Sequence, residues 1–368
     1  EYVPALCMSF ELGAAQWKIA FSPGLGQRPR FRIMQARDLT RLQQEIAAAK
    51  VRFGFSQDAA VLSCYEAGRD GFWLHRALES MGVRNYVVDS ASIEVKRRKK
   101  KVKTDRLDAS KLVEMLLRFR LGEHRVWSVV RVPSVEEEDR RHLHRELATA
   151  KRDRNRIVCR IKSFLFTQGL WVQELKDLPE RLEKIRLWDG APLPAMLQER
   201  LEREWQRLRF ATEQVQQLYA RRRALLRKAE DRGSQIAAKL MRLRSLGADG
   251  SWLLSMELYS WRQFQNGRQI GALCGLTPTP YQSGDESKEL GISKAGNRAI
   301  RHMAIELAWS WLRYQPQSEL SQWYQRRFGH GKSRFRRIGI VALARKLLIA
   351  LWRYLETGVP PAGALLKA

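Results

Sequence analysis

The sequence predicts an α/β amino-terminal domain followed by long helices, and three features of the chain support this prediction. Strand-like and helical stretches alternate from Leu6 to about Val88, which is typical of a layered α/β domain. Beyond Pro133 the composition shifts to long charged helices. From about Gln235 the chain combines helices with loops rich in glycine and proline. We therefore expect three parts, covering residues 1–132, 133–234 and 235–368.

The first part is expected to form a sheet with helices between its strands. The turn residues Pro23, Gly24 and Gly26 separate two antiparallel strands, which precede a crossover helix and a further strand. This order fits a ribonuclease-H-like sheet. The expected elements are strands within Cys7 to Phe21, Phe31 to Gln35, Ala60 to Tyr65 and Tyr86 to Val88, and helices over Asp38 to Lys50 and Asp70 to Met81.

The sequence of the middle part predicts two long helices with apolar stripes. The second helix carries two interleaved heptad series, which favour an antiparallel or intermolecular coiled coil, although Glu204 and Arg222 interrupt its seam. A two-helix arm within one chain and a dimerisation device stand as equal alternatives. The stripes comprise Leu143, Leu147, Ala150, Ile157, Ile161 and Phe164 in the first helix, and Leu197, Leu201, Leu208, Ala211, Val215, Leu218 and Leu225 in the second.

The last part contains two loops with candidate chemistry. The segment Cys274 to Gly284 predicts a rigid turn that ends a helix and presents Ser283. The segment Gly291 to Arg298 predicts a loop that starts a helix over Ala299 to Leu312. Backbone amides and cations at a helix start form a candidate phosphate cradle, whereas the alternative is an N-capped helix with surface charge. The cradle residues are Lys294, Asn297, Arg298 and Arg301.

A cluster of cations and aromatic rings precedes the final apolar helix, which we expect over Ile338 to Leu355. Cations interleaved with aromatic rings suit nucleic-acid contact, although exposed basic loops are common without that task. The cluster contains Arg326, Arg327, Lys332, Arg334, Arg336 and Arg337 around Phe328 and Phe335.

Charge points to a polyanionic partner. The chain has 67 Lys and Arg against 39 Asp and Glu, a net charge of +28 and a pI of about 10.5, which favours nucleic acid over a membrane surface. No apolar run is long enough to span a bilayer, and Glu1 and Pro4 stand where a secretory signal would be basic and apolar. We expect a cytoplasmic protein.

Cysteine and histidine give no sign of a disulfide framework or a zinc site. The four cysteines, including Cys7 and Cys159, are scattered without a C-x-x-C pair, so reduced structural cysteines are the default. His142 and His144 lie two positions apart and face different sides of a helix. We treat both histidines as surface residues.

The most informative stretch runs from Lys103 to Ala109. Asp105 and Asp108 are three residues apart in a helical pattern, so both carboxylates can project from one face. A divalent metal ion relieves the repulsion of two such acids and suits hard oxygen ligands, whereas the alternative is a solvated helix start that favours Asp. A basic run precedes them at Lys96, Arg97, Arg98, Lys99, Lys100, Lys101 and Lys103.

Three ordered motifs carry a resemblance that covers nearly the whole chain. They are Tyr65 to Gly68, Lys103 to Ala109, and Gly275 to Pro278 with Tyr281 to Gly284. The chain resembles the DEDD transposases of bacterial insertion sequences, in the group numbered one-ten and eleven-eleven. The resemblance implies a RuvC-like first domain, a coiled-coil arm, and a carboxy-terminal transposase domain that ends in Ser-Lys-Ala-Gly-Asn and its helix.

The resemblance also implies site residues. The family's four metal-binding acids match Glu11, Glu66, Asp105 and Asp108, which would bind Mg²⁺ (or Mn²⁺), and its serine nucleophile matches Ser283. Glu11 replaces the expected Asp. A glutamate is one methylene longer and can still ligate the metal.

By the same resemblance, the protein is expected to be a recombinase that cuts and rejoins DNA through a phosphoserine bond, at the bacterial nucleoid. A structured non-coding RNA would pair with donor and target DNA, and the protein would form a homodimer or homotetramer. One alternative is a RuvC-like junction endonuclease that uses water and leaves no adduct, and another is a non-catalytic nucleic-acid binder. Ser293 is the nearest competing hydroxyl.

Overall fold

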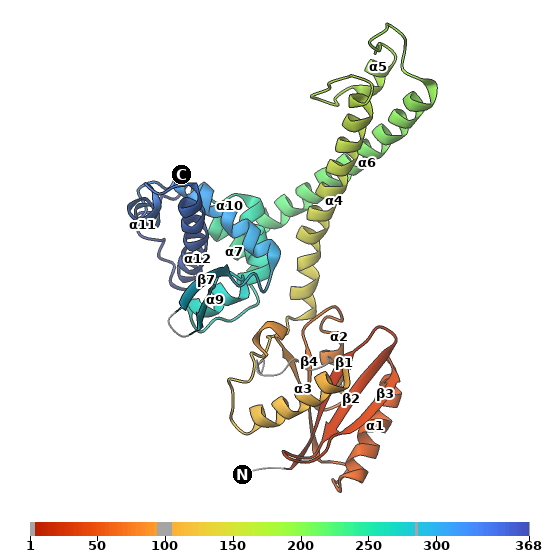
Figure 1. Cartoon of the computed structure of the whole chain (residues 1–368), viewed down its shortest axis with the longest axis vertical. Coiled ribbons are helices and arrows are strands. Elements are labelled where there is room, and N and C mark those ends of the chain that lie inside the picture. The colour runs from red at the N-terminus through yellow and green to blue at the C-terminus, as the bar shows by residue number, and fades with distance from the viewer. Residues whose placement is uncertain (1–3, 94–104, 284–285, 368) are drawn as a thin grey trace. The chain divides into compact units, whose positions relative to one another are not determined.

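The computed structural model describes residues 4–93, 105–283 and 286–367, and only the backbone at residue 91 and over 105–107, 280–283 and 286–290. It divides into two compact units, Glu1–Pro133 and Ser134–Ala368, which are described separately (Figure 1). The division of the second unit into an arm and a carboxy-terminal domain stays a prediction.

The first unit contains a five-stranded mixed sheet, in the strand order β3-β2-β1-β4-β5. β1 pairs antiparallel with β2 and parallel with β4. The turn at Pro23 to Gly26 joins β2 and β3, which are antiparallel as predicted. The stretch from Cys7 to Phe21 proves to be two strands. The strands are β1 (Ala5–Leu12), β2 (Gln16–Ser22), β3 (Arg30–Gln35), β4 (Ala60–Glu66) and β5 (Val83–Val88).

Helices cover both faces of this sheet (Figure 1). The helices α1 (Leu39–Arg52) and α2 (Trp73–Ser80) pack on one face, where Met8 and Phe10 are buried. The helix α3 (Asp105–Arg120) packs on the other face, where it covers Cys7 and Cys64. This alternation along β1 is the two-residue period of a strand that is covered on both sides. A short 3₁₀ turn, η1 (Ser90–Ser92), follows β5.

The second unit begins with two long helices, α4 (Val135–Phe166) and α6 (Ala195–Lys228). They form an antiparallel pair within the chain, because Leu143 shares a cluster with Leu218, and Ile161 shares one with Leu201. α4 starts with a capping box in which Ser134 and Glu137 cap each other's backbone amides. The short helix α5 (Leu178–Leu182) lies in the connection at the far end.

The two residues that interrupt the predicted seam are buried and paired. Glu204 is 3% exposed, and its carboxylate accepts from Arg160 at 2.9 Å and from Arg207 at 2.7 Å. Arg222 is 5% exposed, and its guanidinium lies 2.6 Å from Asp249. The interruptions are therefore two buried charges that are paired with exposed partners of the same chain.

The rest of the second unit is mainly helical. The helix α12 (Ser333–Thr357) buries one side in a core that contains Trp311, Tyr324 and Leu343. No helix among the described residues is long and apolar enough to cross a membrane. The other elements are α7 (Arg232–Met241), α8 (Ala248–Leu254), the π-helix η2 (Ser255–Tyr259), α9 (Gly267–Leu273), α10 (Arg298–Tyr314) and α11 (Glu319–Phe328).

One predicted turn is a strand. α9 ends before Cys274 as expected, but the following residues form the strand β6 (Pro278–Ser283), which pairs antiparallel with β7 (Glu286–Ile292). Pro278 and Pro280 suggested a turn, yet a two-stranded ribbon has free edges where a missing amide hydrogen is tolerated. The register shifts between these two prolines.

Candidate active site

Two of the predicted acids meet at the carboxyl ends of parallel strands. Phe10 pairs with Tyr65 across β1 and β4, so Glu11 and Glu66 are the next residues on two neighbouring strands. Both line one cavity of about 270 Å³. Glu11 also lies opposite Lys18 of β2. The register therefore places a glutamate pair beside a cation at this edge of the sheet.

The other two predicted acids lie at the start of α3, which covers the same face. Cys7, Ser9 and Glu11 alternate along β1, and the Ser9 hydroxyl donates to the carbonyl of Ala109 at 2.7 Å. Asp108 is the neighbour of that residue and is half-buried. The side chain of Asp105 lies outside the described atoms. Among the described residues, no three acid, His or Cys side chains are grouped closely enough to hold a metal ion.

Sequence reasoning missed a third acid of this cavity. Asp70 lines it together with Glu11 and Glu66, and its carboxylate lies 3.5 Å from the guanidinium of Arg69. The sequence predicts a helix that starts at Asp70, whereas the helix α2 begins at Trp73. The loop that shifts the helix start brings Asp70 to the cavity.

The predicted nucleophile lies at the end of the β6–β7 ribbon. Ser283 is the last residue of β6 and pairs in register with Glu286 of β7, and its side chain lies outside the described atoms. The competing Ser293 lies at the opposite end, where its amide donates to the Thr277 carbonyl at 2.9 Å. The hydroxyl of Thr277 also donates to that of Ser293 at 3.4 Å. The two serines thus occupy different ends of one ribbon.

The base of this ribbon is held by close backbone packing. Gly275 and Gly296 have positive φ values of 65° and 84°, and a Cβ on either would lie within about 2 Å of a backbone oxygen. Arg301 reinforces this packing, since its Nη1 donates to the carbonyl of Lys294 at 3.0 Å and more weakly to two others. The ribbon therefore projects from a fixed base.

The predicted phosphate cradle combines a capped helix with exposed cations. The Asn297 side chain accepts from the amides of Ala299 and Ile300, so it caps α10. Arg301 binds loop carbonyls, whereas Lys294 and Arg298 are exposed. The loop therefore contains the helix N-cap that the alternative interpretation predicts. It also contains the exposed cations that phosphate binding requires.

The cluster of cations and aromatic rings before α12 contains one buried ring and one exposed surface. Phe328 is buried and stacks at 4.9 Å between centroids on Phe335, which is 45% exposed. Only Phe335 is therefore placed to meet a partner. Arg334, Arg336 and Arg337 are exposed at the start of α12. The basic run of Lys96, Arg97, Arg98, Lys99, Lys100, Lys101 and Lys103 lies outside the described residues.

The prediction that His144 is a surface residue is wrong. Its side chain is 10% exposed, and its Nε2 lies 3.0 Å from Oε1 of the buried Glu257. Arg145 donates to the same oxygen at 2.7 Å, and Arg141 lies 3.3 Å from Oε2 without hydrogen-bond geometry. Glu257 belongs to η2, so these contacts join α4, the first helix of the arm, to the helices that follow α6. His142 is exposed as predicted.

This cluster lowers the pKa of Glu257. Burial alone would raise that pKa, but hydrogen bonds from His144 and Arg145 and the charges of Arg141 and Arg145 lower it to about 2. The carboxylate is therefore ionised at neutral pH and holds the base of α4 electrostatically.

The cysteines are free thiols among the described residues. Burial raises the pKa of Cys7 and Cys64 beneath α3, and it raises that of Cys274 to about 12. These three thiols are protonated at neutral pH and pack as small apolar groups. Cys159 on α4 is exposed.

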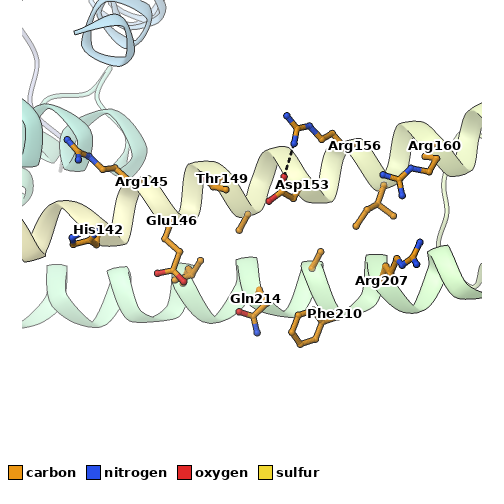
Figure 2. A pocket seen from close by; sticks show the side chains of 14 residues that line it. His142, Arg145, Glu146, Thr149, Asp153, Arg156, Arg160, Arg207, Phe210 and Gln214 are labelled. Carbon is orange, nitrogen blue, oxygen red and sulfur yellow. Dashed lines mark hydrogen bonds and ion pairs between the residues drawn. The ribbon is translucent and has the colours of Figure 1, made fainter. Parts of the chain in front are cut away.

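A groove of about 960 Å³ follows the arm between α4 and α6. Figure 2 shows Arg145, Arg156 and Arg160 along α4, with Arg207 and Phe210 on α6. Arg156 binds Asp153 at 3.2 Å. Ala150, Ile157, Ala211 and Leu218 line the groove between these polar groups. We refer to this surface as the shaft groove.

Comparison with known proteins gives two kinds of match. The family model described as "Transposase IS116/IS110/IS902 family" matches residues 237–324. The chain is 40% identical to y4rJ of Sinorhizobium fredii, a protein assigned by its name to the transposases, over 99% of this chain and 95% of the relative. It is 26% identical to the transposase for insertion sequence element IS1328 of Yersinia enterocolitica, over 57% of this chain and 60% of the relative.

Proposed function

Since this chain belongs to the IS116/IS110/IS902 transposase family, whose members cut and join DNA, we propose that it does so through a covalent bond between Ser283 and DNA. The observation that carries the proposal is the convergence of Glu11 and Glu66 on one cavity, at the end of a strand that contacts the helix bearing Asp108. The strand order and the covering helix also support a ribonuclease-H-like, RuvC-like first domain.

The four acids suit a divalent cation. Carboxylates are hard oxygen ligands, and Glu11, Glu66, Asp105 and Asp108 would hold Mg²⁺ or Mn²⁺ at the carboxyl edge of the sheet. When bound there, the ion would supply positive charge for the phosphodiester under attack. Glu11 in place of an aspartate extends its carboxylate by one methylene and keeps the donor set complete.

Ser283 supplies the nucleophile in this proposal. Its Oγ bonds to phosphorus as the bond from phosphorus to one deoxyribose oxygen breaks; the serine loses its proton, and the departing oxygen gains one. The phosphoserine diester conserves the energy of the broken bond. A DNA hydroxyl then attacks it, rejoins the strand and restores the serine.

The ribbon supports this role for Ser283 over Ser293. The backbone of Ser283 ends β6, away from the packed base, whereas Ser293 lies within that base and hydrogen-bonds Thr277. Lys294 and Arg298 lie beside the base and are exposed. They would bind flanking phosphates and so position the strand.

A structured guide RNA is the second polyanion in the proposal. The net charge of +28 suits a protein that holds both RNA and DNA by their backbones, while base pairing selects the sequence. The basic run from Lys96 to Lys103 and the exposed Arg334, Arg336 and Arg337 would supply such contacts.

The central test is Ser283→Ala with DNA labelled at the transposon end. We expect the covalent protein–DNA adduct to disappear on a denaturing gel, while DNA and RNA binding stay within a few-fold of the unmodified protein. Ser293→Ala is the matched control, and it should retain the adduct. An adduct that survives Ser283→Ala but not Ser293→Ala would move the nucleophile to the other end of the ribbon.

The metal-dependent endonuclease is the alternative function. The four acids are sufficient for this function, since a metal ion bound to them would activate water without a serine. The same gel separates the two, because hydrolysis yields cleaved DNA and no adduct in any variant.

Sequencing the RNA that copurifies with the protein tests the guide. One enriched species that folds and derives from the flank of the element supports guided recombination. Random cellular RNA contradicts it.

A further inference from the structure

The far end of the arm exposes large apolar side chains. We define the arm tip as residues 166–196, between α4 and α6. Its exposed side chains include Phe166 at 64%, Trp171 at 77%, Trp188 at 92% and Met196 at 84%. They lie over a packed core that contains Leu175, Leu178, Leu182 and Leu193. Exposed tryptophans above a complete core are typical of a binding surface.

The arm tip also lacks the excess of positive charge that the whole chain carries. Within residues 166–196 there are four cations and five anions, a net charge of −1, against +28 for the whole chain. A nucleic-acid surface would be basic, so a protein partner is favoured. The anions are Glu174, Asp177, Glu180, Glu183 and Asp189.

Trp188 is presented by a tight turn. The amide of Leu187 donates to the Ala191 carbonyl at 2.8 Å, and that of Gly190 donates to the Leu187 carbonyl at 3.0 Å. The Asp189 carboxylate accepts from the amide of Ala191 at 3.0 Å. The turn is thus fixed before binding, which lowers the entropy lost when the indole docks.

The shaft groove has matching properties. Its four arginines are each paired with a carboxylate of the same chain, so the groove also lacks a large excess of positive charge. It includes Phe210, which is 65% exposed. Figure 2 shows Phe210 projecting from α6 beside Arg207 and Gln214. Apolar lining within a rim of paired charges suits a nearly neutral segment that carries an aromatic anchor.

We propose that the arm tip of one copy docks in the shaft groove of a second copy, with Trp188 as its anchor. Copies of a chain with charge +28 repel each other, and the arm tip is a surface that can approach a second basic chain without that repulsion. A two-fold axis makes the contact reciprocal, so antiparallel arms bury two tips and two grooves. This inference deepens the homodimer that the resemblance implies and is independent of the serine chemistry of the proposed function.

The first test measures self-association of the full-length protein. After nuclease treatment and in high salt, which remove bridging nucleic acid, Trp188→Ser should raise the dimer dissociation constant about tenfold or more in sedimentation velocity. Trp309→Ser, which removes an exposed indole from α10, is the matched control and should leave it unchanged. Circular dichroism confirms the fold of both variants.

The second test locates the contact. In a Cys159→Ser background, which removes the exposed thiol, chains carrying Trp188→Cys are mixed with chains carrying Phe210→Cys and treated with a short bismaleimide. We expect a cross-linked heterodimer. Gln216 is an exposed position on α6 that faces a different pocket. Chains carrying Gln216→Cys should give about tenfold less cross-linked heterodimer.

Two results would overturn the proposal. Equal cross-linking at Phe210→Cys and Gln216→Cys would exclude the shaft groove. Unchanged self-association of Trp188→Ser with weakened nucleic-acid binding would instead assign the indole to base stacking. Because neither test uses DNA cleavage, a failure here is distinguishable from a failure of Ser283 catalysis.

Discussion

Carboxylates occupy two contrasting settings in this protein. Glu257 is 3% exposed and lies among Arg141, His144 and Arg145 of one helix. Glu11 and Glu66 instead line a cavity at the ends of two adjacent strands. The first arrangement joins two elements, whereas the second lines a cavity of about 270 Å³.

The difference teaches how to separate structural acids from candidate catalytic ones. A carboxylate enclosed by arginines stabilises the fold, and its loss leaves buried cations without a partner. Neighbouring carboxylates on parallel strands, about 5 Å apart, repel each other, so their loss should cost function and not stability. The predictions below test this separation.

The largest effect is expected from the cavity. Glu66→Gln combined with Asp108→Asn should reduce DNA cleavage more than about a thousandfold, because the proposed metal site would lose two of its four ligands. The melting temperature should stay the same or rise. Asp70→Asn, in the same cavity, is the control and should retain most cleavage; an equal loss there would show that cavity charge, and not the acid set, matters.

The next effect concerns Glu257. Glu257→Gln should lower the free energy of unfolding by about 3–5 kcal/mol, since Arg141 and Arg145 lose their counter-charge, and calorimetry should show a melting temperature lower by about 10 °C. Cleavage per folded molecule should be kept at temperatures where the variant is folded. Glu306→Gln, at an exposed position on α10, should change stability by less than about 0.5 kcal/mol.

The same cluster should respond to pH. The pKa of Glu257 is lowered from 4.5 to about 2, so its contribution is fully present above about pH 4.5 and is lost as the pH falls towards 2. The stability difference between the unmodified protein and Glu257→Gln should shrink by about 3 kcal/mol over that range. Urea titrations at several pH values measure it, and a constant difference would contradict the electrostatic account.

The smallest effect is expected from Glu11→Asp. It restores the residue type of the resembled family and shortens the side chain by one methylene. We expect cleavage rates within about fivefold of the unmodified protein and a changed Mg²⁺ concentration for half-maximal activity, because ligand reach determines metal affinity. A loss as large as that of the double variant would show that the strand positions are adapted to glutamate.

Local patterns in the sequence predicted most of the first unit. Asp38 was expected to open a helix, and it caps α1 by accepting from the amide of Arg41. The alternation of Cys7, Ser9 and Glu11 follows from strand periodicity alone. The cavity acid Asp70 was missed because its position depends on where α2 starts, which neighbouring side chains decide and local propensity does not.

Long-range contacts explain the other differences. His144 and Glu257 lie 113 residues apart in the chain, so no local pattern links them. Pro278 and Pro280 indicated a turn because proline disfavours strands, but their pairing with β7 places them in an exposed ribbon. The arm was predicted as helices with stripes, and only the structure shows that Glu204 and Arg222 are paired.

These two buried charges make the arm a spacer of fixed length, because they set the register of α6 on α4. A slip of α6 along α4 by one heptad, about 10 Å, would separate Glu204 from Arg160 and Arg222 from Asp249. Glu204 would keep only Arg207 of its own helix, and the buried Arg222 would lose its carboxylate partner. Apolar stripes alone would tolerate such a slip, because heptads repeat. The charges therefore fix the distance between the arm tip and the helices at the base of the arm. An insertion of seven residues in each of the two helices would lengthen that distance.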